Sequence, residues 1–498
     1  MSFWRCLGAV NVLSRRGTLQ VVHVPRRWKK TKKKWQTIQT QRKSEPSFHA
    51  LRHFDENYRH QFGDAWPSIR LGLLSPQKYG ALVNNYGIAE ETEEFLQSLG
   101  AEDFIQPAAR ELLKKMMVDQ SVLEDALMSE SEDASDSSSE SSDEESNIGI
   151  SSLSDDTLQN SEHSGQMNPI EDFTKLQTKS ETGQPKRPWD EKYIVMPGYE
   201  AKMEYLMSAD AVGHRELDSA QTVQEMDLEH IHRPLTISQH LKCFVYGSGS
   251  LERFPPSKMD SGGLFLQYYA MDAASVLPVI ALDVRPRDLV LDLCAAPGGK
   301  ALAIMQTMLA DGLVANEPEA PRRRRLQNVL RQYVGFDRQS SSEVLRITTE
   351  DGRRWGEMEP DTYDKVLVDV PCTTDRLSVT NNDNSIFAVS RTNERWELPK
   401  LQSELLCAGL KAVKPGGDVV YSTCSLSQQQ NDAVVESALY HCQSETNMEV
   451  AVVDLSPLTQ CLGHVFKFWD RAKHGQLVLP NVNKNFGPMY FCKLHRVR

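Results

Sequence analysis

Short apolar runs recur along the C-terminal half of the chain, and each is bounded by polar or charged residues. The runs are too short for ordinary helices and are typical of strands buried on both faces. Stretches with helical character separate them, and strands that alternate with helices indicate parallel βαβ units. The predicted strands span residues 289–293, 313–317, 344–351, 365–370 and 418–423. The predicted fold class is therefore α/β, with a doubly wound, mostly parallel sheet.

Two regions flank these strands. Residues 264–282 are almost continuously apolar and end before Asp283, which predicts one buried helix packed on the sheet. Residues 476–480 and 489–495 are the last apolar runs, and their closeness in sequence predicts an antiparallel pair of edge strands. Ligands of such sheets bind beyond the carboxyl ends of the strands, so the residues that follow each strand are candidates for chemistry.

A glycine turn follows the first predicted strand and leads into a predicted helix. Its residues are Cys294, Ala295, Ala296, Pro297, Gly298, Gly299 and Lys300. Glycine lets the backbone approach a ligand, and the first N–H groups of the helix point toward that ligand. The turn lacks the spacing of the dinucleotide fingerprint and of the P-loop, so phosphate is not the indicated ligand. Taken alone, the turn fits a glycine corner of any α/β protein about equally well.

Acidic residues stand at the ends of three further strands. Glu317 is placed to accept hydrogen bonds from both hydroxyls of a ribose, and Asp351 lies where an adenine amino group would come. Asp369 closes the fourth strand. Any one of these acids could be a helix cap or a solvated carboxylate, but three in register after a glycine corner favour a nucleoside ligand.

Two cysteines occupy comparable positions, Cys372 just past the fourth strand and Cys424 just past the fifth. Adjacent strands lie about 4.8 Å apart, so their carboxyl ends can direct both thiols into one cleft. A single cysteine is more often a small core residue. The chain has 9 cysteines and no CxxC pair, which argues against a disulfide framework or a zinc site and favours a reducing compartment.

Charge is distributed unevenly along the chain. Residues 1–45 carry 12 basic and 1 acidic residue, residues 46–240 carry 15 and 37, and residues 241–498 carry 29 and 30. The basic start, free of acids up to Glu45, predicts a mitochondrial transit peptide at 1–40, with a nucleic-acid-binding arm as the alternative. No run of about 18 apolar residues occurs, which predicts no membrane span.

The middle of the chain divides in two. Residues 45–128 are predicted as an N-terminal helical region with aromatic residues that are more readily core than base-stacking residues, namely Tyr58, Phe62 and Trp66. Residues 129–232 are predicted as an acidic disordered insertion and connector. This segment opens with a stretch of 9 Ser and 8 acidic residues, which cannot form an apolar core.

Three motifs occur together in the α/β domain, 233–498: LDLCAAPGGK, VLVDVPCTTDR and VVYSTCSLSQQQN. In combination they resemble the Sun-domain RNA 5-methylcytosine methyltransferases, above all through the PC and TCS motifs that contain the two cysteines. FGDAWPSIRLGLLSPQKYGALVNN near the N-terminus and NFGPMYFCK near the C-terminus are similar to the mitochondrial ribosomal RNA branch of that family. The long acidic insertion departs from the compact form expected of that branch.

The resemblance implies the S-adenosylmethionine-dependent methyltransferase fold and methylation of cytosine C5. By similarity Cys424 attacks cytosine C6, Cys372 assists product release, and Asp369 holds the N3/N4 edge of the base. The cofactor S-adenosyl-L-methionine would contact the turn from Cys294 to Lys300 together with Glu317, Arg322, Asp351, Gly352 and Asp369. Glu317 is one methylene longer than the Asp that the family often has there. The base must be single-stranded or flipped out.

The resemblance also implies a location and partners. These are the mitochondrial matrix, small-subunit ribosomal RNA with the assembling ribosome, and a helical-repeat protein of the mitochondrial transcription terminator family. The sequence shows no RRM signature, KH loop or zinc knuckle, which fits recognition shared with a partner. Two alternatives remain: a ribosome-assembly scaffold, and an adenine amino methyltransferase. The latter would carry an Asp/Asn-Pro-Pro-Tyr/Phe motif where DVPC stands.

Overall fold

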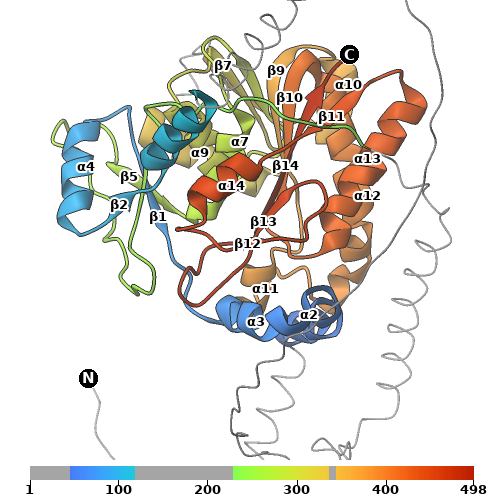
Figure 1. Cartoon of the computed structure of the whole chain (residues 1–498), viewed down its shortest axis with the longest axis horizontal. Coiled ribbons are helices and arrows are strands. Elements are labelled where there is room, and N and C mark those ends of the chain that lie inside the picture. The colour runs from blue at the N-terminus through green and yellow to red at the C-terminus, as the bar shows by residue number, and fades with distance from the viewer. Residues whose placement is uncertain (1–44, 118–227, 336–343) are drawn as a thin grey trace, which may run out of the picture. The chain divides into compact units, whose positions relative to one another are not determined.

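The computed structural model describes residues 45–117, 228–335 and 344–498, which are coloured in Figure 1. Residues 45–112 and the described residues from 228 onward belong to one compact unit. The predicted transit peptide, and all but the last residues of the predicted insertion and connector, lie outside the described residues.

A 10-stranded sheet forms the centre of this unit, in the order β12-β13-β14-β10-β9-β6-β7-β8, with β11 paired to β14 and β3 paired to β11. Neighbours from β10 to β8 pair in parallel, and the chain order reverses between β6 and β9. The predicted α/β class and mostly parallel sheet are confirmed. The parallel strands are β6 (Leu289–Asp292), β7 (Gly312–Asn316), β8 (Leu345–Thr348), β9 (Tyr363–Asp369) and β10 (Val413–Thr423).

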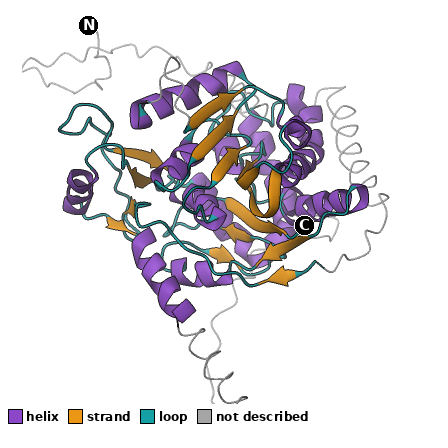
Figure 2. Ribbon diagram, turned by 90° about the horizontal axis from the view of Figure 1, so that it is seen from above, coloured by secondary structure: helices purple, strands orange, loops and turns teal. Residues whose placement is uncertain are grey.

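Helices connect the strands and flank the sheet (Figure 2). In chain order they are α7 (Leu277–Leu282), α8 (Gly299–Gln306), α9 (Ala320–Val334), α10 (Trp355–Met358), α11 (Asp375–Thr380), α12 (Thr392–Ala412), α13 (Asp432–Glu445) and α14 (Ser456–Leu462). α7 contacts β9, β10 and β14, and α12 contacts β9 and β10. Val366, Leu367 and Val368 of β9 are all fully buried, as expected for a central strand covered on both faces.

The antiparallel part of the sheet differs from the prediction. β13 (Gln476–Val478) and β14 (Met489–Arg496) pair as predicted, but β14 is not an edge strand. It also pairs with β10 and with β11 (Val450–Val453). Its first six residues are buried, because both faces of this strand are covered. β11, β12 (Phe468–Trp469) and β3 (His230–Ile231) are strands that the apolar pattern does not predict.

The prediction of one helix over 264–282 is wrong. This run contains β5 (Tyr268–Met271), a 3-10 turn (Ala273–Val276) and only then α7. Asp272 separates them, because its side chain accepts a hydrogen bond from the Ala274 N–H and so starts the helical part. β5 belongs to a 4-stranded sheet of order β2-β4-β1-β5, whose other strands are β1 (Gly80–Val83), β2 (Glu102–Asp103) and β4 (Cys243–Val245).

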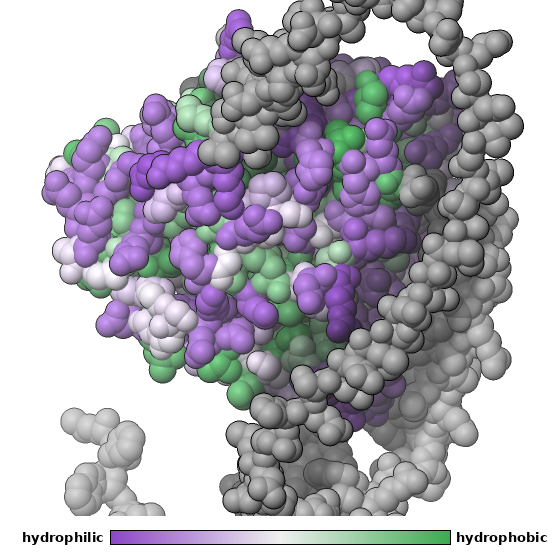
Figure 3. Space-filling view, in the orientation of Figure 1, coloured by the Kyte–Doolittle hydropathy of each residue, from purple (hydrophilic) through white to green (hydrophobic). Residues whose placement is uncertain are grey.

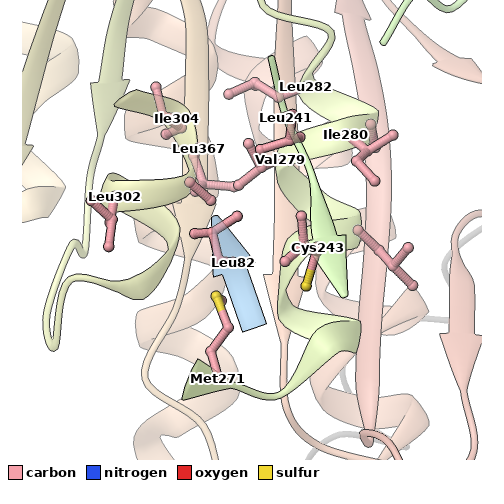
Figure 4. Close-up of a cluster of buried hydrophobic side chains, with 14 of the residues drawn as sticks. Leu82, Leu241, Cys243, Met271, Val279, Ile280, Leu282, Leu302, Ile304 and Leu367 are labelled. Atoms are coloured by element: carbon pink, nitrogen blue, oxygen red, sulfur yellow. The ribbon is translucent and has the colours of Figure 1, made fainter. Parts of the chain in front are cut away.

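The segment before the insertion contains the predicted helices, α2 (Pro46–Phe62), α3 (Trp66–Leu74), α4 (Ala89–Ser98) and a helix at 105–117. It also supplies β1 and β2, so the second sheet combines strands from both sides of the insertion. Tyr58, Phe62 and Trp66 are buried, which confirms that they are core residues. Figure 4 shows Leu82 of β1, Cys243 of β4 and Met271 of β5 in one core with side chains of α7 and α8.

The face seen in Figure 3 is largely hydrophilic, with apolar side chains scattered among the polar ones. In the part of the chain that the structure describes, no helix is long and apolar enough to cross a membrane.

Candidate active site

The carboxyl ends of β6, β9 and β10 meet where the strand order reverses. In a doubly wound sheet this is the point where ligands bind. β6 ends at Asp292, β9 ends at Asp369, and β10 leads directly into Cys424. Ser422 of β10 is the register partner of Asp369, so the residues that follow these two strands are neighbours.

The glycine turn lies directly after β6. Gly298 has a φ of 116° and precedes α8, whose first residue is Gly299. A Cβ on Gly299 would stand only 3.2 Å from the Tyr269 ring. The Ala295 N–H donates to the Asn316 carbonyl over 2.9 Å, which fixes the turn against β7. The left-handed angle at Gly298 and the close approach at Gly299 explain why this corner contains two glycines.

Lys300 and Asp369 form an ion pair in this corner. The Lys300 Nζ lies 2.9 Å from Oδ2 of Asp369, and the Ser422 hydroxyl donates to Oδ1 over 2.8 Å. Burial acts to lower the pKa of Lys300, but the charge and hydrogen bond of Asp369 outweigh it and raise that pKa. Lys300 is therefore a cation at neutral pH, and its ammonium group is fixed by a carboxylate that is itself held from two sides.

The thiols of Cys372 and Cys424 are in contact, with 3.2 Å between the two sulfur atoms. The structure thus brings together the two cysteines that the strand positions place in one cleft. The contact with Cys372, followed by burial, raises the pKa of the Cys424 thiol well above its ordinary value, whereas Lys300 acts to lower it. Cys424 therefore needs a proton acceptor, or a change of surroundings on substrate binding, to react as a thiolate.

Glu317 lies at the end of β7 and is almost fully buried, with 1% of the residue exposed. Its carboxylate accepts from the Glu319 N–H over 2.9 Å and lies 3.3 Å from Arg322. Burial raises the pKa of Glu317, while these two partners act to lower it. Arg322 also donates to the carbonyl of Ala296 over 3.0 Å, so it connects the predicted ribose acceptor to the glycine turn.

The remaining predicted cofactor residues differ in their surroundings. Asp351 is half-exposed and pairs with Arg353, whose hydrogen bonds lower the pKa of Asp351. Gly352 is buried, and a Cβ there would stand 2.6 Å from the Leu405 side chain. Cys294 is half-buried, and burial raises the pKa of its thiol, so that thiol is neutral. Pro297 completes the turn between Ala296 and Gly298.

Asp292 is a site residue that the sequence analysis leaves out. It is fully buried, and neither carboxylate oxygen has a hydrogen-bond partner among the described residues. Burial and the charge of Asp369 raise the pKa of Asp292 to about 8, and Lys300 offsets only part of this effect. A buried carboxylate without a partner fits a positively charged ligand group such as the ammonium of S-adenosylmethionine. The signal in the sequence is an acid within an otherwise apolar strand.

Asn316 is a second site residue that the sequence pattern does not single out. Its side-chain amide donates to the carbonyls of Leu293 and Glu350, over 3.1 and 2.9 Å, and its oxygen accepts from the Thr348 hydroxyl and the Glu350 N–H. One side chain therefore joins the ends of β6, β7 and β8. A polar residue beside Glu317 at a strand end is the only hint of this role in the sequence.

The site combines a buried acid, a fixed cation, two thiols in contact and a tight glycine corner. Among the described residues no cluster of His, Cys, Asp and Glu could hold a metal ion. The site thus offers sulfur groups beside fixed charges that can orient a polar ring.

Comparison with known proteins identifies the family. A family model described as 16S rRNA methyltransferase RsmB/F matches residues 279–494. The 5-cytosine rRNA methyltransferase NSUN4 of Mus musculus is 39% identical over 478 residues, which cover 95% of this chain and 94% of that protein. The protein of the same name from Xenopus tropicalis is 40% identical and covers 94% of both chains.

A third relative matches only part of the chain. The mitochondrial tRNA (cytosine(34)-C(5))-methyltransferase of Danio rerio is 42% identical over 259 residues, 52% of this chain and 67% of that protein. The extended similarity to the first two proteins therefore distinguishes one branch of relatives from the other. This chain belongs to the Sun-domain family of RNA 5-methylcytosine methyltransferases, in the branch of its fourth member, and it uses S-adenosylmethionine as methyl donor.

Proposed function

We propose that this protein methylates carbon 5 of a cytosine in mitochondrial small-subunit ribosomal RNA, by covalent catalysis through Cys424. The observation that supports the mechanism is the 3.2 Å contact between Cys424 and Cys372 beside the Lys300–Asp369 ion pair. The substrate class is supported by the relatives named as rRNA methyltransferases, which match about 95% of the chain, whereas the tRNA enzyme matches about half of it.

Covalent attack answers a specific chemical problem, since cytosine C5 is a weak nucleophile. Once a proton acceptor has taken the proton of the Cys424 thiol, addition of the thiolate to C6 moves the electron pair of the C5–C6 double bond toward C5, which becomes nucleophilic. S-adenosylmethionine, when bound, supplies an electrophilic methyl group. Loss of the C5 proton then restores the double bond and expels the Cys424 thiolate. Cys372, in contact with that sulfur, is placed to assist this elimination.

Asp369 is suited to hold the base. Lys300 and Ser422 fix its carboxylate at the end of β9, and a carboxyl group there can face the N3/N4 edge of a cytosine. A proton shared at that edge would offset the negative charge that the ring gains when sulfur adds to C6. The chain's own groups would therefore orient the base and stabilise its charge while Cys424 forms the bond.

Several residues would hold the cofactor. Glu317, buried at the end of β7, supplies oxygens for the two ribose hydroxyls, and Asp292 supplies a carboxylate for the ammonium group. Gly298 and Gly299 form the tight turn whose backbone would face the ligand. Arg322, Asp351 and Gly352 line the neighbouring strand ends and complete the set that the family resemblance implies.

We also propose that the protein acts in the mitochondrial matrix and contributes to ribosome assembly with a helical-repeat partner of the transcription terminator family. The basic N-terminal composition supports import, as does the mitochondrial location in the name of the Danio rerio relative. Fusion of residues 1–44 to a reporter tests the location. A reporter in the cytosol or nucleus would contradict it.

Bisulfite sequencing of mitochondrial RNA, with and without this protein, tests the substrate. We expect one cytosine of the small-subunit ribosomal RNA to lose its methyl mark when the protein is absent. The mark should return with the wild-type chain but not with Cys424→Ala. A lost mark in transfer RNA instead would contradict the proposed substrate. If Cys424→Ala restores ribosome assembly in full, the fold acts there as a scaffold.

A further inference from the structure

Asp375 lies three residues after Cys372, at the start of α11, and is fully buried. Its carboxylate accepts hydrogen bonds from the Tyr58 hydroxyl and the Leu426 N–H, each over 2.7 Å. It also accepts from the hydroxyls of Thr373 and Ser425. An ionised carboxylate only accepts hydrogen bonds, so it suits four converging donors better than an amide does.

These donors belong to the loops that carry the two thiols. Thr373 follows Cys372 and Ser425 follows Cys424, and their hydroxyl oxygens lie 2.9 Å apart. The Asp375 N–H also donates to the carbonyl of Cys424 over 3.3 Å. Asp375 therefore contacts both loops. Its side chain binds the residue that follows each cysteine, and its backbone N–H binds Cys424 itself.

The other donor, Tyr58, comes from α2, more than 300 residues earlier in the chain. In Figure 1 α2 and α3 lie next to α11, and α11 contacts both helices. The Gln61 side chain of α2 donates to the Leu426 carbonyl over 2.6 Å and accepts from the Gln428 N–H over 3.3 Å. One turn of α2 thus contacts the loop after Cys424 at two points, through Gln61, and contacts Asp375 at a third, through Tyr58.

We infer that Asp375 is a positioning residue that sets the separation of the Cys372 and Cys424 sulfur atoms, and that Tyr58 couples the N-terminal segment to this function. The inference rests on the proposed roles of the two thiols for its effect on methylation. Its geometric part stands alone, because the distance between the sulfur atoms can be measured without RNA or cofactor. A displacement of about 1 Å at a reacting group can cost on the order of a hundredfold in rate.

Oxidation by diamide measures this geometry. Two thiols give up two protons and two electrons, the S–S bond forms, and diamide is reduced to the hydrazine. We expect the wild-type protein to form the Cys372–Cys424 disulfide rapidly, as mapped by mass spectrometry of the digested chain. Asp375→Asn should slow this reaction at least about tenfold. Tyr58→Phe, which removes one hydroxyl, should slow it about two- to tenfold.

The matched control is Asp418→Asn. Asp418 is a buried carboxylate in the middle of β10, the strand that leads into Cys424. It forms ion pairs with Lys365, Arg233 and His495, none of which belongs to either thiol loop. Its replacement should lower stability but leave the rate of disulfide formation unchanged. Circular dichroism identifies which variants are folded. If Asp375→Asn does not fold, Tyr58→Phe decides the question, because this change keeps the ring and its packing.

The kinetic readout is the rate of methyl transfer to mitochondrial ribosomal RNA. Asp375→Asn should lower kcat about a hundredfold with little change in the KM for S-adenosylmethionine, because the cofactor residues are untouched. Wild-type rates of disulfide formation in both folded variants would overturn the inference. Slower disulfide formation with full methylation would uphold the positioning role and overturn the proposed chemistry of the thiols instead.

Discussion

The two ends of the sheet around β9 and β10 differ in how their buried ionisable groups are paired. Toward the amino end, Asp418 is 2% exposed and is surrounded by basic side chains. Its carboxylate binds Lys365, Arg233 and His495, with Lys493 3.5 Å away. Burial opposes its ionisation, but the hydrogen bond from His495 and the charges of the lysines outweigh it. They hold the pKa of Asp418 well below its usual range.

At the carboxyl end, Lys300 and Asp369 are paired, but the carboxyl group beside them has no hydrogen-bond partner among the described residues. Asp292, at the end of β6 beside β9, is fully buried with both oxygens unpartnered in the described residues. Its pKa is raised to about 8, chiefly by burial. The Cys424 thiol is held next to another thiol, and its pKa is also raised.

The difference fits a division of roles, in which one end of the sheet stabilises the fold and the other is the end where we propose that ligands bind. A buried charge is tolerated when it is paired, and an unpaired one costs free energy until something binds. The paired cluster around Asp418 therefore supports the structure, whereas the unpartnered Asp292 and the Cys424 thiol lie where we propose that the ligands bind. Substitutions at five residues test this comparison.

The largest effect is expected for Cys424→Ala. Loss of the attacking sulfur should lower methylation by more than about a thousandfold, with no covalent RNA adduct. Cys372→Ala should instead allow attack and methyl transfer, and then stall before elimination. That variant should accumulate a protein–RNA species that survives a denaturing gel. An adduct from Cys424→Ala but not from Cys372→Ala would reverse the two roles.

The next effect concerns the amino end. Asp418→Asn removes the carboxylate that pairs with the buried Lys365, while Lys493 keeps Asp283 at 3.6 Å, and the loss should cost about 3–5 kcal/mol of unfolding free energy. Because the pKa of Asp418 is depressed, its stabilisation is present above the ordinary carboxyl pKa and is lost as pH falls through the folded value. Urea unfolding at pH 7 measures the loss. A change in activity per folded molecule would show that the two ends are not independent.

Asp292→Asn should have opposite effects on the free and the bound protein. Its folded pKa of about 8 means that the folded chain holds a proton which the unfolded chain has lost, so stability falls as pH rises toward 8. The Asn variant should be more stable than wild type at pH 8.5 by more than about 1 kcal/mol. Urea unfolding at pH 6 and pH 8.5 measures this difference.

The same variant should bind S-adenosylmethionine about tenfold to a hundredfold more weakly, because a charge-assisted contact is lost. In wild type, cofactor binding between pH 6.5 and 7.5 should release close to one proton, since a cation at Asp292 displaces it. Calorimetry in two buffers of different ionisation enthalpy detects that proton. Equal heats in both buffers would remove Asp292 from the cofactor site.

Glu317→Ala is expected to have the smallest effect. It removes acceptors for two ribose hydroxyls, and the affinity for S-adenosylmethionine should fall at least about tenfold. Calorimetric titration of the folded variant measures this. Glu317→Asp serves as the matched control, since it keeps the charge that the family often has there, and it should retain most of the affinity. An unchanged affinity in Glu317→Ala would contradict the assignment.

The sequence by itself determined the parallel strands and which residues follow their carboxyl ends. A central strand buried on both faces is a short apolar run, so β6, β7, β9 and β10 can each be predicted from their own sequence. The glycine turn can be predicted because glycine readily combines a left-handed backbone φ with close packing. The neighbouring positions of Cys372 and Cys424 follow from adjacent parallel strands, and the structure places their sulfur atoms 3.2 Å apart.

Only the tertiary structure decided how distant segments meet. An apolar run such as 264–282 satisfies burial either as a helix or as a strand followed by a helix, and pairing with β1 selects the second. β14 becomes central because both β10 and β13 pair with it. The contact of Tyr58 with Asp375 joins residues 317 positions apart, and nothing local in either segment encodes it. A local sequence pattern indicates which side chains must be buried, because burial depends on their polarity. The segment that buries them depends on tertiary packing, which the local pattern does not specify.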